Sequence, residues 1–342
     1  MRLGLAQRLT YVSLLSSVST VVVGIQPPVP LQDGETPPDP YNRCGLDSVS
    51  PGRCPPHKCC SEAGYCGDSK DYCKGSQCQL EYSDSCDTFF APKGADTDRI
   101  PRPLIGNVPY GAIIDQCRPG TMALTYDDGP GEYTSQLLDL LDELKVKATF
   151  FITGNGNGKG HIDEESSGYP QVLRRMHGAG HQLGSHTWTH RSLDALLMFE
   201  RHENRDLGPA VRRTEVMFNE MAFRNILGFF PTYFRPPYLD CGSSCRAFLE
   251  EYGYHIISAN SDTKDYENDD PALIANSRAR FSDAVGRDAN AQGYIVLAHD
   301  VHYQSVANLT AYMVNEARNR GYELLTVGEC LGDPKENWYR KA

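Results

Sequence analysis

The chain has 342 residues, 40% of them hydrophobic, with a formal net charge of -11 at pH 7 and a sequence pI near 5.4. This length and hydrophobic fraction suffice for one large folded domain, or for a large and a small one. The negative charge argues against nucleic acid as a partner, because phosphates would be repelled, whereas a neutral polymer or a cationic partner is compatible with it.

Residues 1–24 have the pattern of a secretory signal peptide. Two arginines precede an apolar run at residues 9–23, and Gly24 offers a small residue where cleavage could occur. A membrane anchor is the alternative, but the run is short and diluted by Ser and Thr. We expect a secreted protein, extracellular or associated with the cell wall, without membrane attachment after cleavage. Residues 25–40 are proline-rich and are expected to be an extended linker.

Residues 41–90 form a small cysteine-rich module. Eight of the twelve cysteines lie between Cys44 and Cys86, in CGLDSVSPGRCPPHKCCSEAGYCGDSKDYCKGSQCQLEYSDSC. So short a segment buries little apolar surface and needs disulfides to fold. A zinc module is the alternative, which the adjacent Cys59 and Cys60 and the oxidising compartment argue against. Sequence alone does not choose among the available pairings.

A second linker is expected at residues 91–116, followed by a large domain at 117–332 and a polar tail at 333–342. In chain order, the expected strands are 122–126, 148–153, 182–185, 232–234, 255–259, 294–298 and 322–327. The helices expected between them are 135–145, 171–177, 210–224, 245–251, 271–281 and 307–318. About seven strand–helix alternations predict an α/β fold in which a parallel sheet forms a distorted barrel.

The four remaining cysteines lie in this large domain. Cys117 precedes its first expected strand and Cys330 follows its last, so a bridge between them would tie the two ends of the domain together. Cys241 and Cys245 are close enough in sequence to pair locally. Because secreted proteins rarely sustain a redox cycle, we expect both pairs to be structural.

Polar, titratable residues follow five of the expected strands, where the active sites of parallel barrels lie. These segments are TYDDGP at 125–130, HTWTH at 186–190, RPPY at 235–238, DTKDY at 262–266 and LAH at 297–299. Each alone has an ordinary explanation: Asp-Gly-Pro favours a turn, and many His pairs are solvated or buried in a core. Their convergence at the strand ends favours a catalytic site.

Two imidazoles and one carboxylate suit a catalytic zinc ion with open positions for water and substrate. We predict Asp128, His186 and His190 as its ligands. Neighbouring side chains on a strand point in opposite directions, so Asp127 can stand beside the water and accept its proton. The same ligand types hold iron in some oxygenases, an alternative that the second aspartate disfavours.

In this order and spacing, the five segments resemble the motifs of the polysaccharide deacetylases of carbohydrate esterase family 4, the NodB homology group. The similarity spans roughly residues 117–330. It implies a distorted barrel, removal of acetyl groups from a glycan, and a divalent cation held by the Asp-His-His set, with Zn²⁺ first and Co²⁺ as the alternative.

The resemblance also implies the role of each residue. Asp127 is the expected general base, and Arg235 keeps it ionised and oriented. His299 is the expected general acid, and Asp265 raises its pKa. The backbone N–H of Tyr238 is expected to join the metal in stabilising the oxyanion.

Three side chains are expected to contact the substrate: Tyr238, Tyr266 and Leu297. The fourth motif of the family usually ends in Trp, where this chain has Tyr266. We expect this departure to change the wall of the substrate groove without abolishing activity.

The cysteine-rich segment is similar to hevein-like chitin-binding modules in its cysteine order and in the pieces CCS and GYCG. The similarity implies the disulfides Cys44–Cys60, Cys54–Cys66, Cys59–Cys73 and Cys78–Cys86. It also implies that Ser61, Tyr65 and Tyr72 bind N-acetylglucosamine units. Ala63 stands where an aromatic residue is common, so weaker sugar binding is expected.

Both similarities indicate chitin and chitooligosaccharides as the partners of a secreted, monomeric, metal-dependent chitin deacetylase. We expect the module to be a separate anchor, whose removal leaves activity on soluble oligomers intact. A deacetylase of acetylxylan or peptidoglycan and a chitin-binding protein with an inactive barrel remain the alternatives. Asn308 begins the sequence Asn-Leu-Thr, which is a glycosylation sequon.

Overall fold

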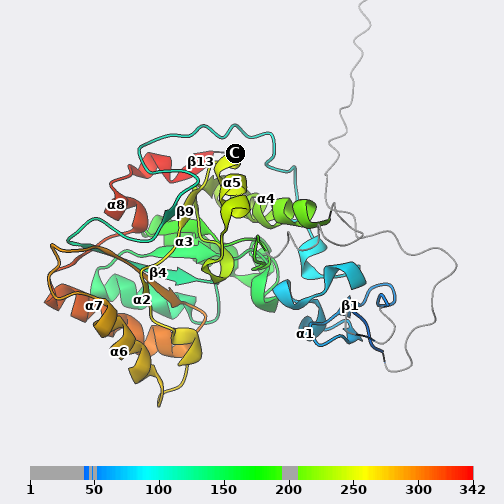
Figure 1. Ribbon diagram of the computed structural model, residues 1–342, viewed down its shortest axis with the longest axis horizontal. Helices are drawn as coiled ribbons and strands as arrows, with labels where there is room; N and C mark the ends of the chain where they lie inside the picture. The colour runs from blue at the N-terminus through cyan, green and yellow to red at the C-terminus, as the bar shows by residue number, and fades with distance from the viewer. Residues whose placement is uncertain (1–41, 46–47, 49–51, 195–206, 342) are drawn as a thin grey trace, which may run out of the picture.

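The computed structural model describes residues 42–45, 48, 52–194 and 207–341 (Figure 1). The expected signal peptide and the proline-rich linker, residues 1–24 and 25–40, lie outside the described residues. A nine-stranded sheet forms the centre of the large domain, and the small cysteine-rich module lies at one side of it (Figure 1). Among the described residues, no helix combines the length and the apolar composition needed to cross a bilayer.

All neighbouring strands of the central sheet are parallel, in the order β10-β11-β4-β5-β6-β8-β9-β3, with β12 beside the start of β4. Within the described chain no ladder joins the end strands β10 and β3, so the sheet curls into an incomplete barrel. The predicted α/β fold with a distorted barrel is confirmed. The strands are β3 Ile113–Ile114, β4 Thr121–Asp127, β5 Thr149–Ile152, β6 Gln182–Ser185, β8 Tyr233–Phe234, β9 His255–Ile257, β10 Ser261–Asp262, β11 Tyr294–His299 and β12 Glu323–Leu324.

Strand β4 shows how the sequence positions the site. Its seven residues, TMALTYD, are all buried, as expected for a parallel strand covered on both faces. It pairs with β11 from Met122 opposite Tyr294 to Asp127 opposite His299. Because opposite residues of a ladder share a face, Asp127 and His299 lie side by side at the carboxyl edge of the sheet.

Helices cover the sheet on both sides, with α2, α6 and α7 grouped below it and α4 and α5 above it in Figure 1. Helix α2 buries Leu137, Leu138 and Leu141 on one face, which the periodicity of the sequence predicts. The helices are α2 Thr134–Leu144, α3 Tyr169–Gly178, α4 Leu207–Leu227, α5 Ser243–Glu251, α6 Ile274–Ala284, α7 Thr310–Asn319 and α8 Val327–Leu331.

The end of the domain differs from the prediction. The segment 322–327 was expected to be one strand, but only β12 pairs, and α8 begins at Val327. Thr326 is the reason: its hydroxyl accepts from the N–H of Glu329, whose carboxylate accepts from the N–H of Thr326. This capping box starts a helix at the point where the strand would have continued.

The expected linker at 91–116 and tail at 333–342 are built into the large domain. Strand β3 pairs with β9, and Arg102 forms an ion pair of 2.7 Å with the buried Glu220 of α4. Strand β13, Tyr339–Lys341, pairs antiparallel with β7, Phe229–Pro231. Both segments therefore depart from the prediction, because each finds backbone or charged partners that are distant in sequence.

The small module contains the hairpin β1–β2, Cys59–Cys60 with Cys66–Gly67, the helix α1, Lys70–Cys73, and three short 3₁₀ helices, Gly75–Gln77, Leu80–Tyr82 and Asp87–Phe89. All twelve cysteines of the chain form disulfides. The pairs coincide with those expected, namely Cys44–Cys60, Cys54–Cys66, Cys59–Cys73, Cys78–Cys86, Cys117–Cys330 and Cys241–Cys245. The bridge between Cys117 and Cys330 joins the two ends of the large domain across 213 residues.

Candidate active site

A cavity of about 390 Å³ opens at the carboxyl edge of the sheet, where the polar ends of β4, β6, β8, β10 and β11 meet. Eight of the predicted site residues line it: Asp127, Asp128, His186, His190, Tyr238, Tyr266, Leu297 and His299. Pro236, Leu239, Asp262 and His302 complete the lining. Residues separated by up to 175 positions in sequence are thus brought to one cavity, as the parallel strand order predicts.

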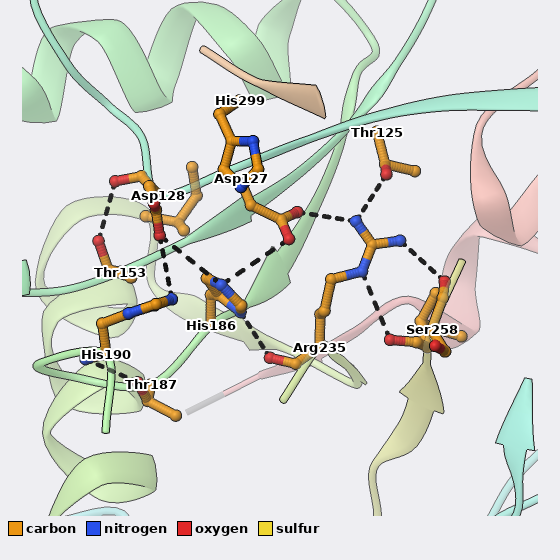
Figure 2. A network of polar contacts seen from close by, with 12 residues as sticks. Thr125, Asp127, Asp128, Thr153, His186, Thr187, His190, Arg235, Ser258 and His299 are labelled. Carbon is orange, nitrogen blue, oxygen red and sulfur yellow. Dashed lines mark hydrogen bonds and ion pairs between the residues drawn. The ribbon is translucent and has the colours of Figure 1, made fainter. Parts of the chain in front are cut away.

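Asp128, His186 and His190 lie close enough to share one ion (Figure 2). The Asp128 Oδ1 atom is 3.7 Å from Nε2 of His186 and 3.4 Å from Nε2 of His190. Atoms bound tetrahedrally to zinc at 2.0–2.1 Å lie about 3.3 Å apart, so the three donors need only a small adjustment. One further observation fits a cation: Asp128 Oδ1 is buried and has no hydrogen-bond partner among the residues that the structure describes.

The protonation of these groups also suits a cation. The Nδ1 atom of His186 lies 2.6 Å from the carbonyl oxygen of Arg235, an acceptor, so Nδ1 carries the proton and Nε2 is free to bind metal. Burial lowers the pKa of His186 to about 4, which keeps the ring neutral at pH 7. Burial raises the pKa of Asp128, but the imidazoles of His190 and His186 outweigh it and lower the pKa to about 2.

Arg235 fixes the orientation of Asp127 by bonding one of its carboxylate oxygens (Figure 2). Its guanidinium is fully buried and donates to Asp127 Oδ1 at 2.8 Å and to the hydroxyl of Thr125 at 2.6 Å. It also donates to the carbonyl of Ser258 at 2.9 Å and lies over the ring of Phe151. A buried, hydrogen-bonded ion pair of this kind holds the carboxylate in one orientation. The other oxygen of Asp127, Oδ2, faces the histidines, 3.8 Å from Nε2 of His186.

His299, beside Asp127 at the end of β11, is held by the buried carboxylate of Asp265. The ring Nδ1 lies 2.8 Å from Asp265 Oδ1, and the backbone N–H of His299 donates to Oδ2 at 2.7 Å. The hydroxyl of Ser305 donates to the same Oδ2 at 2.6 Å. Burial lowers the pKa of His299, but its charge interaction and hydrogen bond with Asp265 outweigh burial and raise the pKa to about 10. The ring is therefore protonated at neutral pH, as a proton donor needs to be.

Five non-glycine residues that line the cavity or adjoin its lining in the loops after β4, β6 and β8 have positive φ: Asp128 (75°), Thr187 (70°), His190 (62°), Tyr238 (61°) and Leu239 (55°). Such conformations cost about 1–3 kcal/mol each and persist where the surroundings impose them. The backbone is thus bent at the points where the proposed ligands and Tyr238 turn into the cavity.

Comparison with known proteins shows the family to which the chain belongs. Residues 115–257 match the family model described as polysaccharide deacetylase, a range that contains the three proposed ligands, Asp127, Arg235 and Tyr238. The chain is 45% identical over 234 residues to a chitin deacetylase of Colletotrichum lindemuthianum, covering 68% of this chain and 88% of the relative. The chain belongs to the polysaccharide deacetylase family.

Two further comparisons agree with this assignment. A chitin deacetylase of a Pestalotiopsis species is 42% identical over 238 residues, covering 69% of this polysaccharide deacetylase and 72% of the relative. The solved structure of the chitin deacetylase from the fungal pathogen Colletotrichum lindemuthianum superposes with a TM-score of 0.63 at 44% identity, covering 69% of this chain and 98% of that one. The predicted enzyme class, a deacetylase, is confirmed.

The small module of this polysaccharide deacetylase has its own match. Residues 43–86 match the family model described as chitin recognition protein, which confirms the predicted hevein-like module. Tyr65 is exposed, with the Arg43 guanidinium 4.7 Å from its ring centroid, and Ser61 is buried with its hydroxyl 3.3 Å from the N–H of Tyr65. Tyr72 is half-buried and packs against the backbone of Gly67.

Substrate contacts predicted from the sequence lie around the same cavity. The ring of Tyr266 is half exposed and lies 5.4 Å from the ring of His299, centroid to centroid, so it can wall the groove. Leu297 is buried and lines the cavity.

Asn308 of the glycosylation sequon lies elsewhere, half-buried in the π-helical turn Ser305–Leu309, and the guanidinium of Arg278 contacts its backbone carbonyl at 3.3 Å. Its glycosylation stays a prediction.

Lys159 also belongs to the site, although no motif in the sequence indicates it. Its ammonium donates to the carbonyl oxygens of Asp128 and Gly129, both at 2.7 Å, and to the hydroxyl of Thr153 at 2.8 Å. Lys159 thus ties the turn after β4 to the loop after β5. It lies within a glycine-rich loop, and a bond from a side chain to backbone carbonyls leaves no spacing pattern by which it could be found.

Proposed function

We propose that this protein hydrolyses the N-acetyl groups of N-acetylglucosamine units in chitin, giving acetate and a free amine. One observation carries the proposal: the Asp128, His186 and His190 donors lie in one cavity with Asp127, which is bonded to Arg235, and His299, which is bonded to Asp265. Close relatives described as chitin deacetylases and the chitin-recognition match support chitin as the polymer.

A divalent cation, Zn²⁺ first and Co²⁺ as the alternative, would be held by Asp128, His186 and His190 and would supply Lewis acidity to the attacking water and to the acetyl carbonyl oxygen. Asp127 accepts the proton that the water loses on attack. Its Oδ1 is occupied by Arg235, so Oδ2, which faces the cavity, is the proton acceptor. The hydrogen bond from the buried guanidinium prevents the Asp127 carboxylate from rotating away.

His299 donates a proton to the departing nitrogen. An amine leaves poorly unless it is protonated, so breaking the carbon–nitrogen bond needs an acid near the leaving group. Asp265 keeps this ring charged and fixes its orientation through Nδ1, so Nε2 is the atom that carries the transferred proton. The backbone N–H of Tyr238 is proposed to bond the carbonyl oxygen as negative charge develops there.

The same proposal extends to the setting of the enzyme. All twelve cysteines are paired, which is typical of proteins that mature in an oxidising compartment. Together with the chitin-recognition module, this supports a secreted enzyme acting outside the cell or at a cell wall. Neither nucleic acid nor a membrane takes part in the proposed reaction.

Acetate release from defined substrates tests the proposal. The purified chain is incubated with N-acetylglucosamine oligomers, acetylxylan and peptidoglycan at matched acetyl concentrations, with Asp127→Asn as the matched inactive control. We expect acetate chiefly from the chitin oligomers and almost none from the variant. If more acetate is released from acetylxylan or peptidoglycan, that polymer and not chitin is the substrate. If none of the three polymers releases acetate, the protein is a chitin-binding protein without this activity.

A further inference from the structure

The chitin-recognition module is packed against the large domain beside the loop that carries both proposed histidine ligands (Figure 1). Leu80 and Phe89 of the module are buried in one hydrophobic cluster with Leu193, Val216 and Phe234 of the large domain. A module used only as a tethered anchor would bury its apolar residues within itself. The shared cluster instead gives the two parts a common core.

Arg191 extends this contact from the position next to His190. Its side chain is almost fully buried and donates to the carbonyl oxygens of Gly75 at 2.7 Å and Cys78 at 2.8 Å. It also donates through Nε to the hydroxyl of Thr88 at 2.9 Å. Gly75 and Cys78 lie within the 43–86 match and Thr88 two residues after it, in the cysteine-rich segment 41–90 that we take as the module. The loop of the large domain therefore depends on this segment for these hydrogen bonds.

Thr189 lies between the two proposed histidine ligands and is held from both sides. Its hydroxyl lies 2.9 Å from the hydroxyl of Thr88, and its backbone N–H donates to the carboxylate of Glu215 on α4 at 2.7 Å. Thr88, Thr189 and Glu215 are all fully buried. The loop is therefore fixed between a helix of the large domain and a hydroxyl of the module.

The module also reaches the mouth of the cavity. The hydroxyl of Tyr238 donates to the hydroxyl of Ser76 at 3.1 Å. The ring of Tyr238 in turn lies 4.8 Å from the ring of His190, centroid to centroid, and lines the cavity. Ser76 is thus placed to fix the side chain of a residue that the substrate must pass.

We propose that the chitin-recognition module is a fixed part of the active site, in which Thr88 and Arg191 act as positioning residues for the loop that carries His186 and His190. Loss of the Thr88 hydroxyl leaves the buried Nε–H of Arg191 without its acceptor and removes one partner of the Thr189 hydroxyl, which still donates to Glu215. Moving the loop can restore a hydrogen bond to the Arg191 donor. A displaced loop separates the two imidazoles from Asp128. Removal of the module then weakens metal binding and turnover even on soluble substrates, in contrast to the expectation from the sequence.

The test compares two substitutions at Thr88. Thr88→Val keeps the shape and removes the hydroxyl, whereas Thr88→Ser keeps the hydroxyl, and Arg280→Met on the exposed surface of α6 controls for general effects. Three quantities are measured on the full chain: amide hydrogen exchange of residues 187–191 in the metal-free protein, the zinc dissociation constant, and kcat and KM on a soluble N-acetylglucosamine tetramer.

We expect Thr88→Val to speed exchange in the loop, to weaken zinc binding about fivefold or more, and to lower kcat more than it raises KM. Thr88→Ser and Arg280→Met should stay within about twofold of the wild type. Arg191→Met is a second, stronger variant and should exceed Thr88→Val in all three measurements. If Thr88→Val leaves exchange, zinc affinity and kcat unchanged, the module is only an anchor and the inference is wrong.

The inference rests on the proposed function, because that function makes His186 and His190 metal ligands. Failure of the inference and failure of the proposed function nevertheless give different results. Hydrogen exchange in the metal-free protein requires neither zinc nor turnover. If residues 187–191 of the wild type are protected from exchange but the protein never releases acetate, the proposed function is wrong and the positioning role of Thr88 stands. If the wild type is active and Thr88→Val does not change exchange in the loop, only the positioning role is wrong.

Discussion

Two adjacent acids, Asp127 and Asp128, have different surroundings although they share one turn. Asp127 ends β4 and faces the buried Arg235, whereas Asp128 turns away at positive φ toward His186 and His190. One carboxylate is thereby paired with a fixed cation of the protein. The other has a buried oxygen that no group in the described part of the chain hydrogen-bonds, which suits a metal ligand.

This division of roles predicts the behaviour of Asp127→Asn. The amide keeps the shape but cannot accept the proton of the attacking water, so kcat should fall about 10²- to 10⁴-fold. The three proposed ligands are untouched, so zinc content by elemental analysis should stay at the wild-type value. Loss of zinc from this variant would mean that Asp127 is itself a ligand.

Asp265→Asn tests the acid. The carboxylate of Asp265 is what raises the pKa of His299 against the opposing effect of burial, so its removal should lower that pKa. The protonated form of His299 is the active one, and it would then be lost at a lower pH. The alkaline limb of the profile of kcat/KM against pH should move to lower pH relative to the wild type. An unmoved limb would show that His299 is not the group that titrates there.

At the scale of elements, β4 and β11 form the part of the sheet on which the site depends. Their full-length register brings Asp127 opposite His299, and α2 covers β4 with a face of buried leucines. Truncating one such side chain removes buried apolar contacts and leaves a cavity.

Leu141→Ala should therefore lower the free energy of unfolding by about 2–5 kcal/mol. Leu141 is fully buried in the core of the large domain, whereas Glu143, two residues along the same helix, is exposed. Glu143→Ala is the matched control and should change stability by less than about 0.5 kcal/mol. Urea unfolding followed by circular dichroism measures both, and equal effects would contradict the assignment of the buried face.

The sequence predicts the long elements of the large domain, because amphipathic helices and buried strands repeat their pattern over several turns or pairs. It misses β3 and β10, since two residues carry no period and pair only because a distant strand is beside them. The tail strand β13 was missed for the same reason. Capping by Thr326 and Glu329 was readable in principle, but the apolar run before it favoured a strand.

The same reasoning applies to the site. The proposed ligands and acids follow strands in recognisable segments, so they could be predicted individually and then found together. Lys159 and Thr88 could not, because each acts through contacts that depend on how distant segments pack. The docking of the module depends on complementary surfaces, which no spacing within either part reveals.

At the scale of the whole molecule, the chain is closed by the bridge between Cys117 and Cys330, which span 213 residues. Cross-linking so long a loop restricts the unfolded chain, which stabilises the fold by up to about 5 kcal/mol in the chain-entropy description. The double variant Cys117→Ser/Cys330→Ser should lose about 2–5 kcal/mol of unfolding free energy, measured by urea denaturation. No loss would mean that contacts between the two ends of the domain suffice without the bridge.

The most direct test of the whole account is the dependence of acetate release on a single bound cation. The purified chain is stripped with a chelator, titrated with Zn²⁺, and assayed on an N-acetylglucosamine tetramer with products resolved by mass spectrometry. The account predicts no deacetylated product from the stripped protein and full recovery at one zinc per chain, with His190→Ala unable to recover at that ratio. Undiminished deacetylation by the stripped protein would contradict it.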